Sequence, residues 1–198
     1  MKPDVVLVDG GGTNIGSVRY ALQRLGFDAE LSAEPERIRR ATHVILPGVG
    51  AAGPGMARLR EAGLVDVLRE LRQPLLGVCL GMQLLFGNSE EGDTPCLGLM
   101  PGTVRKMSCA AGRRVPHMGW NELHIDRADP LLDGLGPKAH AYFVHSYAAP
   151  CTDATVASCD HGASFSAVVR RGNVCGTQFH PERSAAVGAR LLRNFLEQ

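Results

Sequence analysis

A cysteine between two glycines is the first place in this sequence where chemistry is expected. Cys79 ends the apolar run 74–78, and Gly77 and Gly81 stand two residues away on either side. A strand–turn–helix passage of this kind lifts a nucleophile above the edge of a sheet, and glycines at these positions avoid clashes in the sharp turn. The N-terminus of the following helix favours a negative charge on the sulfur. The alternative from this stretch alone is an inert, buried cysteine between ordinary turn glycines.

A possible base for this thiol lies a hundred residues further along the chain. His180 follows the apolar strand pattern 174–179 and precedes Pro181 and Glu182. A cysteine nucleophile needs a base within hydrogen-bond reach, and the base needs an acceptor that orients it. Taken alone, the tripeptide could be a solvated surface turn. Combined with the glycine-flanked cysteine, it predicts a catalytic triad of Cys79, His180 and Glu182.

Acyl transfer also needs donors for the oxyanion that forms when the thiol attacks. The backbone N–H of Leu80, directly after the nucleophile, is one natural donor. The second must come from a neighbouring strand end, and the segment Pro47-Gly48-Val49-Gly50 fits because its glycines let the backbone approach a ligand. The alternative for this segment is a plain tight turn.

The first half of the chain alternates strands with helices. Continuous apolar runs predict buried strands, and apolar residues at helical spacing predict helices. The strands are expected at 5–8, near 28–31, at 43–46 and at 75–78, and the helices over 15–25, near 35–40, within 51–72 and over 80–86. This alternation predicts an α/β fold, a three-layer domain with a central, mostly parallel mixed sheet flanked by helices.

The second half has a different pattern, in which strand-like runs follow one another after short turns. They cover 103–107, 120–125, 140–147, 155–159, 164–170 and 173–179. Such runs predict antiparallel additions to the sheet. A last helix is expected to bury Val187, Leu191, Leu192 and Phe195, with Ser184 as its N-cap. No linker or repeat divides the chain, so we expect one domain over residues 1–198.

Composition excludes several classes of function. The formal net charge is +1, so no basic field indicates a nucleic-acid partner. No apolar run is long enough to cross a bilayer, and no signal peptide is recognisable at the N-terminus. The six cysteines form no Cys-x-x-Cys pair, which argues against structural zinc and indicates free thiols in the reducing cytoplasm. We expect no metal and no organic cofactor.

Three of these motifs together resemble a known enzyme family. The cysteine segment 77–83, the segment 47–50 and the tripeptide 180–182 look like a class I, triad-type glutamine amidotransferase domain, whose fold is flavodoxin-like. Three further segments, 116–121, 142–147 and 178–184, resemble the glutaminase-subunit branch that serves imidazole glycerol phosphate synthase in histidine biosynthesis. This resemblance covers essentially the whole chain.

The resemblance implies a role for each matching residue. Cys79 would attack the side-chain amide of L-glutamine, with His180 as base and then acid and Glu182 orienting His180. Val49 and Leu80 would donate their N–H groups to the oxyanion. The residues that match the family's positions for the amino-acid end of glutamine are Gly48, Gly50, Gln83, Ser146 and Tyr147. For Ser146 and Tyr147 the alternative is a core strand with alternating polar faces.

The resemblance also implies a partner. The family's glutaminase subunit passes ammonia to a separate cyclase subunit with a (β/α)₈ barrel, forming a heterodimer. The candidates for this interface are Asn14, Pro116, Met118, Trp120 and Arg183. Trp120 suits an interface anchor, and the alternative is burial in this domain's own core.

Two other functions compete with this interpretation. The glycine-rich segment 9–14 also resembles the first phosphate loop of actin-like sugar kinases. Such a two-domain kinase needs a much longer chain and a second acidic loop, and neither is present. The other rival is an amidotransferase-like regulator without catalysis, but such relatives usually lack the cysteine or the histidine, and both are intact here.

Overall fold

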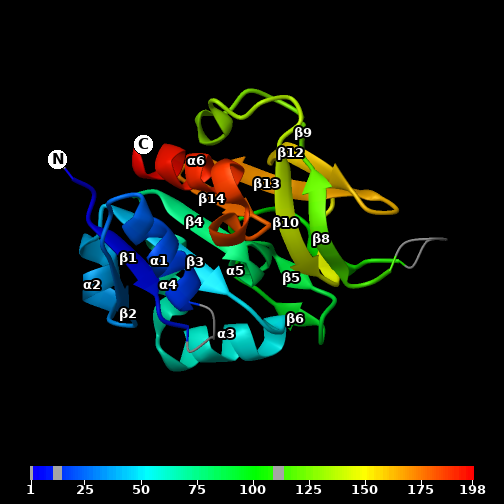
Figure 1. The fold of residues 1–198 in the computed structure, drawn as a ribbon. Helices are drawn as coiled ribbons and strands as arrows, with labels where there is room; N and C mark the ends of the chain where they lie inside the picture. The colour runs from blue at the N-terminus through cyan, green and yellow to red at the C-terminus, as the bar shows by residue number, and fades with distance from the viewer. Residues whose placement is uncertain (1, 11–14, 109–113) are drawn as a thin grey trace.

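A large mixed β-sheet forms the centre of the protein in the computed structural model, which describes residues 2–10, 15–108 and 114–198 (Figure 1). The first half supplies β1 (Val5–Val8), α1 (Ile15–Arg24), β2 (Ala29–Ser32), α2 (Pro35–Arg40), β3 (His43–Gly48), α3 (Ala52–Glu61), α4 (Leu64–Glu70), β4 (Leu75–Cys79) and α5 (Leu80–Leu84). The strand and helix positions predicted for this half agree closely with these bounds, because long apolar runs and helical spacing both reflect burial.

The second half contributes mainly short strands. They are β5 (Asn88–Ser89), β6 (Thr94–Pro95), β7 (Thr103–Lys106), β8 (His117–Glu122), β9 (His124–Ile125), β10 (His140–His145), β11 (Tyr147–Ala148), β12 (Thr155–Asp160), β13 (Ser164–Arg171) and β14 (Val174–Thr177). Two 3₁₀ turns, η1 (Pro130–Leu132) and η2 (Pro181–Arg183), and the helix α6 (Ala185–Leu196) complete the described chain.

The central sheet has eight strands in the order β2-β1-β3-β4-β14-β13-β12-β9. The part from β2 to β14 is parallel, and β13, β12 and β9 extend it in antiparallel pairing. This mostly parallel mixed sheet confirms the predicted α/β class. Because β3, β4 and β14 are neighbours, their carboxyl ends meet at one edge, which is where open α/β sheets bind ligands.

Helices cover both faces of this sheet and make the fold three-layered. Alternate residues of β1 belong to different cores: Val5 and Leu7 pack with α1 and α6, whereas Val6 and Val8 pack with the helices α2 to α5. Figure 1 shows α6 and α3 on opposite sides of the strands. The period of two along a strand therefore explains why these runs are apolar throughout.

The second half departs from the prediction of simple additions to the sheet. β8 and β10 form a separate two-stranded antiparallel ribbon, and β11, β7, β5 and β6 form a further small sheet. The strand expected over 120–125 is in fact two strands, because the chain leaves β10 at Leu123, whose N–H bonds to Ala139 O at 2.8 Å, and joins β12. Local alternation cannot reveal such a change of partner.

The helix after Cys79 is also shorter than expected. The sequence pattern predicts a helix to Phe86, whereas α5 ends at Leu84. The carbonyl oxygens of Leu84, Leu85 and Phe86 instead accept hydrogen bonds from the backbone N–H groups of residues 97–100. Tertiary hydrogen bonds thus replace the last helical turn, since they satisfy the same carbonyl groups.

Two negative findings concern the described residues only. No helix among them is long and apolar enough to cross a membrane. The cysteines in that part of the chain, at positions 79, 96, 151, 159 and 175, are free thiols, while Cys109 lies outside it.

Candidate active site

The turn at Cys79 has the strained backbone that a nucleophile elbow requires. Cys79 lies at φ 53° and ψ −111°, a conformation that residues with a side chain rarely adopt. A Cβ on Gly77 would stand 2.7 Å from the backbone of Gly81 and Met82, and one on Gly81 would stand 1.8 Å from Leu46 O. Only glycine fits at these two positions, as the sequence pattern predicted.

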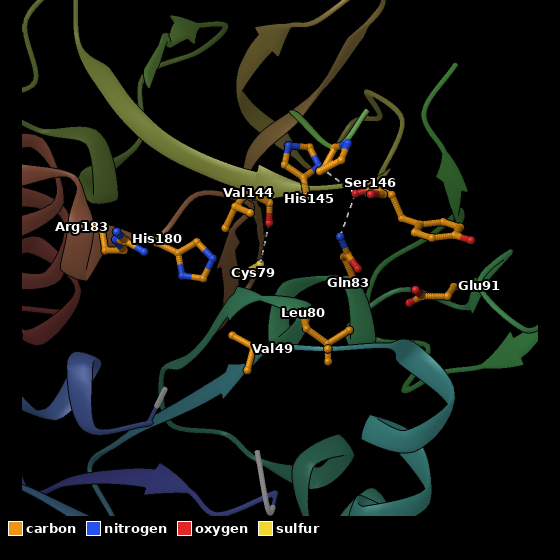
Figure 2. A pocket seen from close by; sticks show the side chains of 13 residues that line it. Val49, Cys79, Leu80, Gln83, Glu91, Val144, His145, Ser146, His180 and Arg183 are labelled. Atoms are coloured by element: carbon orange, nitrogen blue, oxygen red, sulfur yellow. Dashed lines mark hydrogen bonds between the residues drawn. The ribbon is translucent and has the colours of Figure 1, made fainter. Parts of the chain in front are cut away.

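His180 and Glu182 form a buried pair beside the thiol. His180 Nδ1 lies 2.8 Å from Glu182 Oε1, and both side chains are almost fully buried. Figure 2 shows the imidazole ring of His180 pointing toward Cys79. Burial lowers the pKa of His180, but hydrogen bonds and charge from Cys79 and Glu182 outweigh it and raise the pKa to about 10. The structure therefore brings the three predicted residues together in an arrangement suited to proton exchange between the thiol and the imidazole.

The loop that carries His180 is fixed to the β10 strand. His180 N–H donates to Tyr142 O at 3.0 Å, and Tyr142 N–H donates to Ser184 Oγ at 2.9 Å. Ser184 stands before α6, as predicted, but it makes no capping hydrogen bond with its side chain. Ser184 is thus the N-cap residue of α6 by position, as predicted, but its hydroxyl bonds to Tyr142 N–H and His180 O instead of capping the helix, and it holds the histidine loop.

A pocket of about 400 Å³ opens above the thiol. The predicted residues that line it are Val49, Gly50, Cys79, Leu80, Gln83, Pro116, Ser146, Tyr147, His180 and Arg183. Gly48 and Glu182 lie outside this pocket and line a small neighbouring space. Gly48 is paired with Cys79 in the β3–β4 register, and a Cβ there would meet Gly81 N at 3.0 Å. Gly48 thus packs against the turn at Cys79 on the side away from the pocket, and it does not line the pocket.

Gln83 presents one defined polar atom to this pocket. Its Nε2 group donates to Tyr147 O at 2.8 Å and to Gln178 Oε1 at 2.9 Å. A backbone carbonyl can only accept, so Tyr147 fixes which end of the Gln83 amide is the nitrogen. Both amide hydrogens are used within the protein, and Oε1 is left as an acceptor. Ser146 and Tyr147 are accordingly pocket residues, not part of a plain core strand.

Glu91 is a pocket residue that sequence reasoning missed. Its Oε2 accepts a hydrogen bond from Ala52 N at 2.8 Å, at the start of α3. Figure 2 shows its carboxylate at the end of the pocket away from His180, on the same side as Gln83. The acidic stretch 90–93 was the available signal, but nothing in its spacing singles out one carboxylate.

An exposed apolar surface adjoins the pocket. Met118 and Trp120 on β8 are 64% and 54% exposed, so burial of Trp120 in the core is ruled out. Trp120 packs edge-on against Tyr142, and the guanidinium of Arg183 lies 4.7 Å from the centre of the Tyr142 ring. Asn14, the remaining interface candidate, lies outside the described residues. In the described part of the chain, no cluster of side chains could hold a metal ion.

Comparisons with known proteins agree with this geometry. The family model for glutamine amidotransferase class-I matches residues 6–198. The imidazole glycerol phosphate synthase subunit HisH of Xanthomonas axonopodis pv. citri is 63% identical over 194 residues, which cover 98% of this chain and 97% of that protein. The corresponding subunit of Xylella fastidiosa strain Temecula1 is 60% identical with the same coverage.

A solved structure described as a glutamine amidotransferase has the same fold. It superposes with a TM-score of 0.75 at 27% sequence identity and covers 97% of both chains. The match over residues 6–198 also overturns the sugar-kinase alternative, whose glycine-rich segment lies largely outside the described residues. The strained cysteine, the buried histidine–glutamate pair and these similarities lead to one assignment. The chain belongs to the class I glutamine amidotransferase family.

Proposed function

We propose that this chain is the glutaminase subunit of imidazole glycerol phosphate synthase and acts as a single amidotransferase domain over residues 1–198. It would hydrolyse L-glutamine and pass the ammonia to a cyclase subunit in histidine biosynthesis, in the cytoplasm. The observation that carries the proposal is the Cys79, His180 and Glu182 arrangement at the base of an open pocket. The relatives at 60–63% identity support the choice of this branch.

The chemistry follows from these three side chains. The Cys79 sulfur attacks the side-chain amide carbon of glutamine, while His180 holds the proton of the thiol. His180 then gives this proton to the departing nitrogen, so that ammonia leaves and a γ-glutamyl thioester remains. A water molecule, deprotonated by His180, hydrolyses the thioester to glutamate and restores the thiol. Glu182 keeps Nδ1 of His180 as the donor to its carboxylate, which directs the other ring nitrogen toward the sulfur.

The pocket also supplies groups for the remaining atoms of glutamine. The backbone N–H groups of Val49 and Leu80 would stabilise the oxyanion beside the sulfur, since both residues line the pocket there. The Gln83 oxygen and the Glu91 carboxylate are both acceptors and would bind the α-ammonium group. Gly50, Ser146 and Tyr147 would contact the amino-acid end through their backbone, with Gly48 supporting the turn from below.

The exposed surface beside the pocket would receive the cyclase. Ammonia released into neutral water is protonated and is then no longer a nucleophile, so a direct transfer between subunits is needed. Pro116 and Arg183 line the pocket, and Met118 and Trp120 extend the same region into an apolar patch. A large, exposed aromatic residue beside an opening is typical of an interface anchor. Asn14 is the fifth residue that we propose for this interface.

A glutaminase assay tests the proposal. The purified protein is incubated with L-glutamine, with and without the cyclase subunit and a cyclase ligand, and glutamate release is measured. We expect release that depends on Cys79 and is lost in Cys79→Ala. Cys151→Ala is the matched control, because Cys151 is an exposed free thiol away from the pocket. Absence of release from the wild-type complex would contradict the proposal.

A further inference from the structure

A chain of hydrogen bonds leads away from the pocket floor into the β8–β10 ribbon. His145 Nδ1 lies 2.8 Å from Tyr147 O, the same carbonyl that accepts from Gln83. His145 Nε2 lies 3.1 Å from His117 Nδ1, and His117 Nε2 lies 3.3 Å from Asn121 Nδ2. The two histidines face each other because they are paired residues in the β8–β10 register.

The groups at the two ends of this series of hydrogen bonds fix which atom donates and which accepts in each of them. Tyr147 O can only accept, so His145 carries a proton on Nδ1. At the other end, the Asn121 amide donates to His117 Nε2, so His117 donates from Nδ1 and His145 accepts at Nε2. That amide also donates to Asp160 O at 2.9 Å, which fixes its own orientation. Both imidazoles are therefore neutral, each with one defined tautomer.

Packing holds these rings in place. His117 and His145 are 3% and 6% exposed. The ring of His117 stacks on Phe143 and on His161, with ring centroids 4.8 Å and 4.1 Å apart. The ring centroids of His145 and Phe165 are 5.0 Å apart, with the rings edge to face. Burial lowers the pKa of His145 to about 4, with a smaller contribution in the same direction from His161 and His180, against the raising effect of its bond to Tyr147. His145 therefore stays neutral around pH 7.

We propose that His145 and His117 are positioning residues for glutamine binding, which fix the Tyr147 carbonyl and through it the orientation of the Gln83 amide. The proposal rests on the glutaminase function proposed above and deepens it. Without the His145 donor, Tyr147 O loses one of its two hydrogen bonds and its peptide is freer to rotate. Gln83 then no longer presents its oxygen alone to the pocket, and glutamine binds less tightly while the Cys79 chemistry is untouched.

Two substitutions at one position separate hydrogen bonding from packing. His145→Leu fills similar space without a donor, whereas His145→Asn places an amide N–H where Nδ1 stands. In the complex with cyclase, we expect His145→Leu to raise the KM for glutamine about tenfold, as for one lost hydrogen bond, with little change in kcat. His145→Asn should recover most of that loss. His140→Leu and His140→Asn, on the exposed end of β10, are the matched controls and should change neither constant.

The outcomes are decisive in both directions. A wild-type KM in His145→Leu, or equal damage in the leucine and asparagine variants, would overturn the proposal. Long-range ¹⁵N–¹H NMR of the histidine rings tests the hydrogen-bond chain without any assay of activity. We expect His145 and His117 as neutral Nδ1–H tautomers from pH 6 to pH 8, and an Nε2–H tautomer at His145 would contradict the chain. The NMR measurement does not depend on glutaminase activity, so failure of this proposal can be distinguished from failure of the proposed function.

Discussion

The hydroxyl of Ser184 donates to the carbonyl oxygen of His180 over 2.7 Å, and through this bond the proposed base is tied to a strand of the ribbon. The same hydroxyl accepts from Tyr142 N–H, and His180 N–H returns to Tyr142 O. These bonds close a ring between β10 and the histidine loop. The position of the imidazole thus depends on a residue that touches neither thiol nor substrate.

Removal of this hydroxyl should therefore impair turnover. In Ser184→Ala, the N–H of Tyr142 and the carbonyl of His180 lose a buried partner, which costs about 1–3 kcal/mol of stability. We expect kcat for glutamine hydrolysis to fall about tenfold as the imidazole becomes less well held, with a smaller change in KM. Steady-state assays of glutamate release measure kcat and KM, and urea denaturation measures the loss of stability.

Ser158→Ala is the matched control for this prediction. Ser158 is also buried, and its hydroxyl donates to Asp126 Oδ1 at 3.1 Å on β12, away from the pocket. We expect a similar loss of stability with an unchanged kcat. Equal kcat losses in the two variants would indicate general destabilisation rather than a role of Ser184 in holding His180.

Replacement of Glu182 should change the titration of His180. The pKa of His180 is raised to about 10 from its ordinary 6.5, so the stabilisation from its proton is complete below pH 6.5 and is lost as the pH rises through about 10. Glu182→Gln removes one of the two partners that raise this pKa, while burial still lowers it. We therefore expect a lower pKa, measured by NMR of the imidazole Cε1 proton, and a weaker dependence of stability on pH between 7 and 10. An unchanged titration would contradict the pairing.

Alanine at Gly81 should prevent the native turn. Its Cβ would lie 1.8 Å from Leu46 O, so the backbone itself would have to move, and we expect a loss of more than about 4 kcal/mol. Gly16→Ala is the matched control, because Gly16 is in α1 and the nearest atom to an added Cβ is 3.8 Å away. That variant should be as stable as the wild type or up to about 1 kcal/mol more stable, by thermal denaturation.

Trp120 should contribute strongly to partner binding. We expect Trp120→Ala to weaken the affinity for the cyclase subunit at least about tenfold, as for a central aromatic residue in an interface. Isothermal titration calorimetry with the cyclase measures this loss. Tyr20→Ala, at a somewhat more exposed aromatic residue on α1, should leave the affinity unchanged. Equal affinities for the wild type and Trp120→Ala would place the interface elsewhere.

The parallel half of the fold and the placement of Cys79, His180 and Glu182 at one sheet edge were predictable from the sequence. The strands β1, β3 and β4 are buried on both faces and therefore read as unbroken apolar runs. The turn at Cys79 can be recognised in the sequence because only glycine fits sterically at positions 77 and 81. In such cases one local constraint determines both the residue type and the structure.

The remaining features depend on contacts between distant segments. The ribbon of β8 and β10, the role of Ser184 and the pocket position of Glu91 all arise from tertiary pairing. A serine before a helix looks like an N-cap in any sequence, and only the presence of Tyr142 across the loop gives its hydroxyl another use. Local patterns carry no information on such partners, so these features could not have been predicted.

The region around Cys79 is packed backbone against backbone. The glycines 77, 81 and 176 meet peptide groups or the inner end of Met82 at distances that leave no room for a Cβ. Peptide groups have no rotamers, so these backbone contacts hold the main chain of Cys79 in place. The position of the sulfur then varies only through the side-chain torsion of Cys79. The location of the nucleophile is thereby insulated from side-chain disorder elsewhere in the core. Mutations that repack that core should therefore change the thermal stability of the protein well before they change the position of the Cys79 thiol.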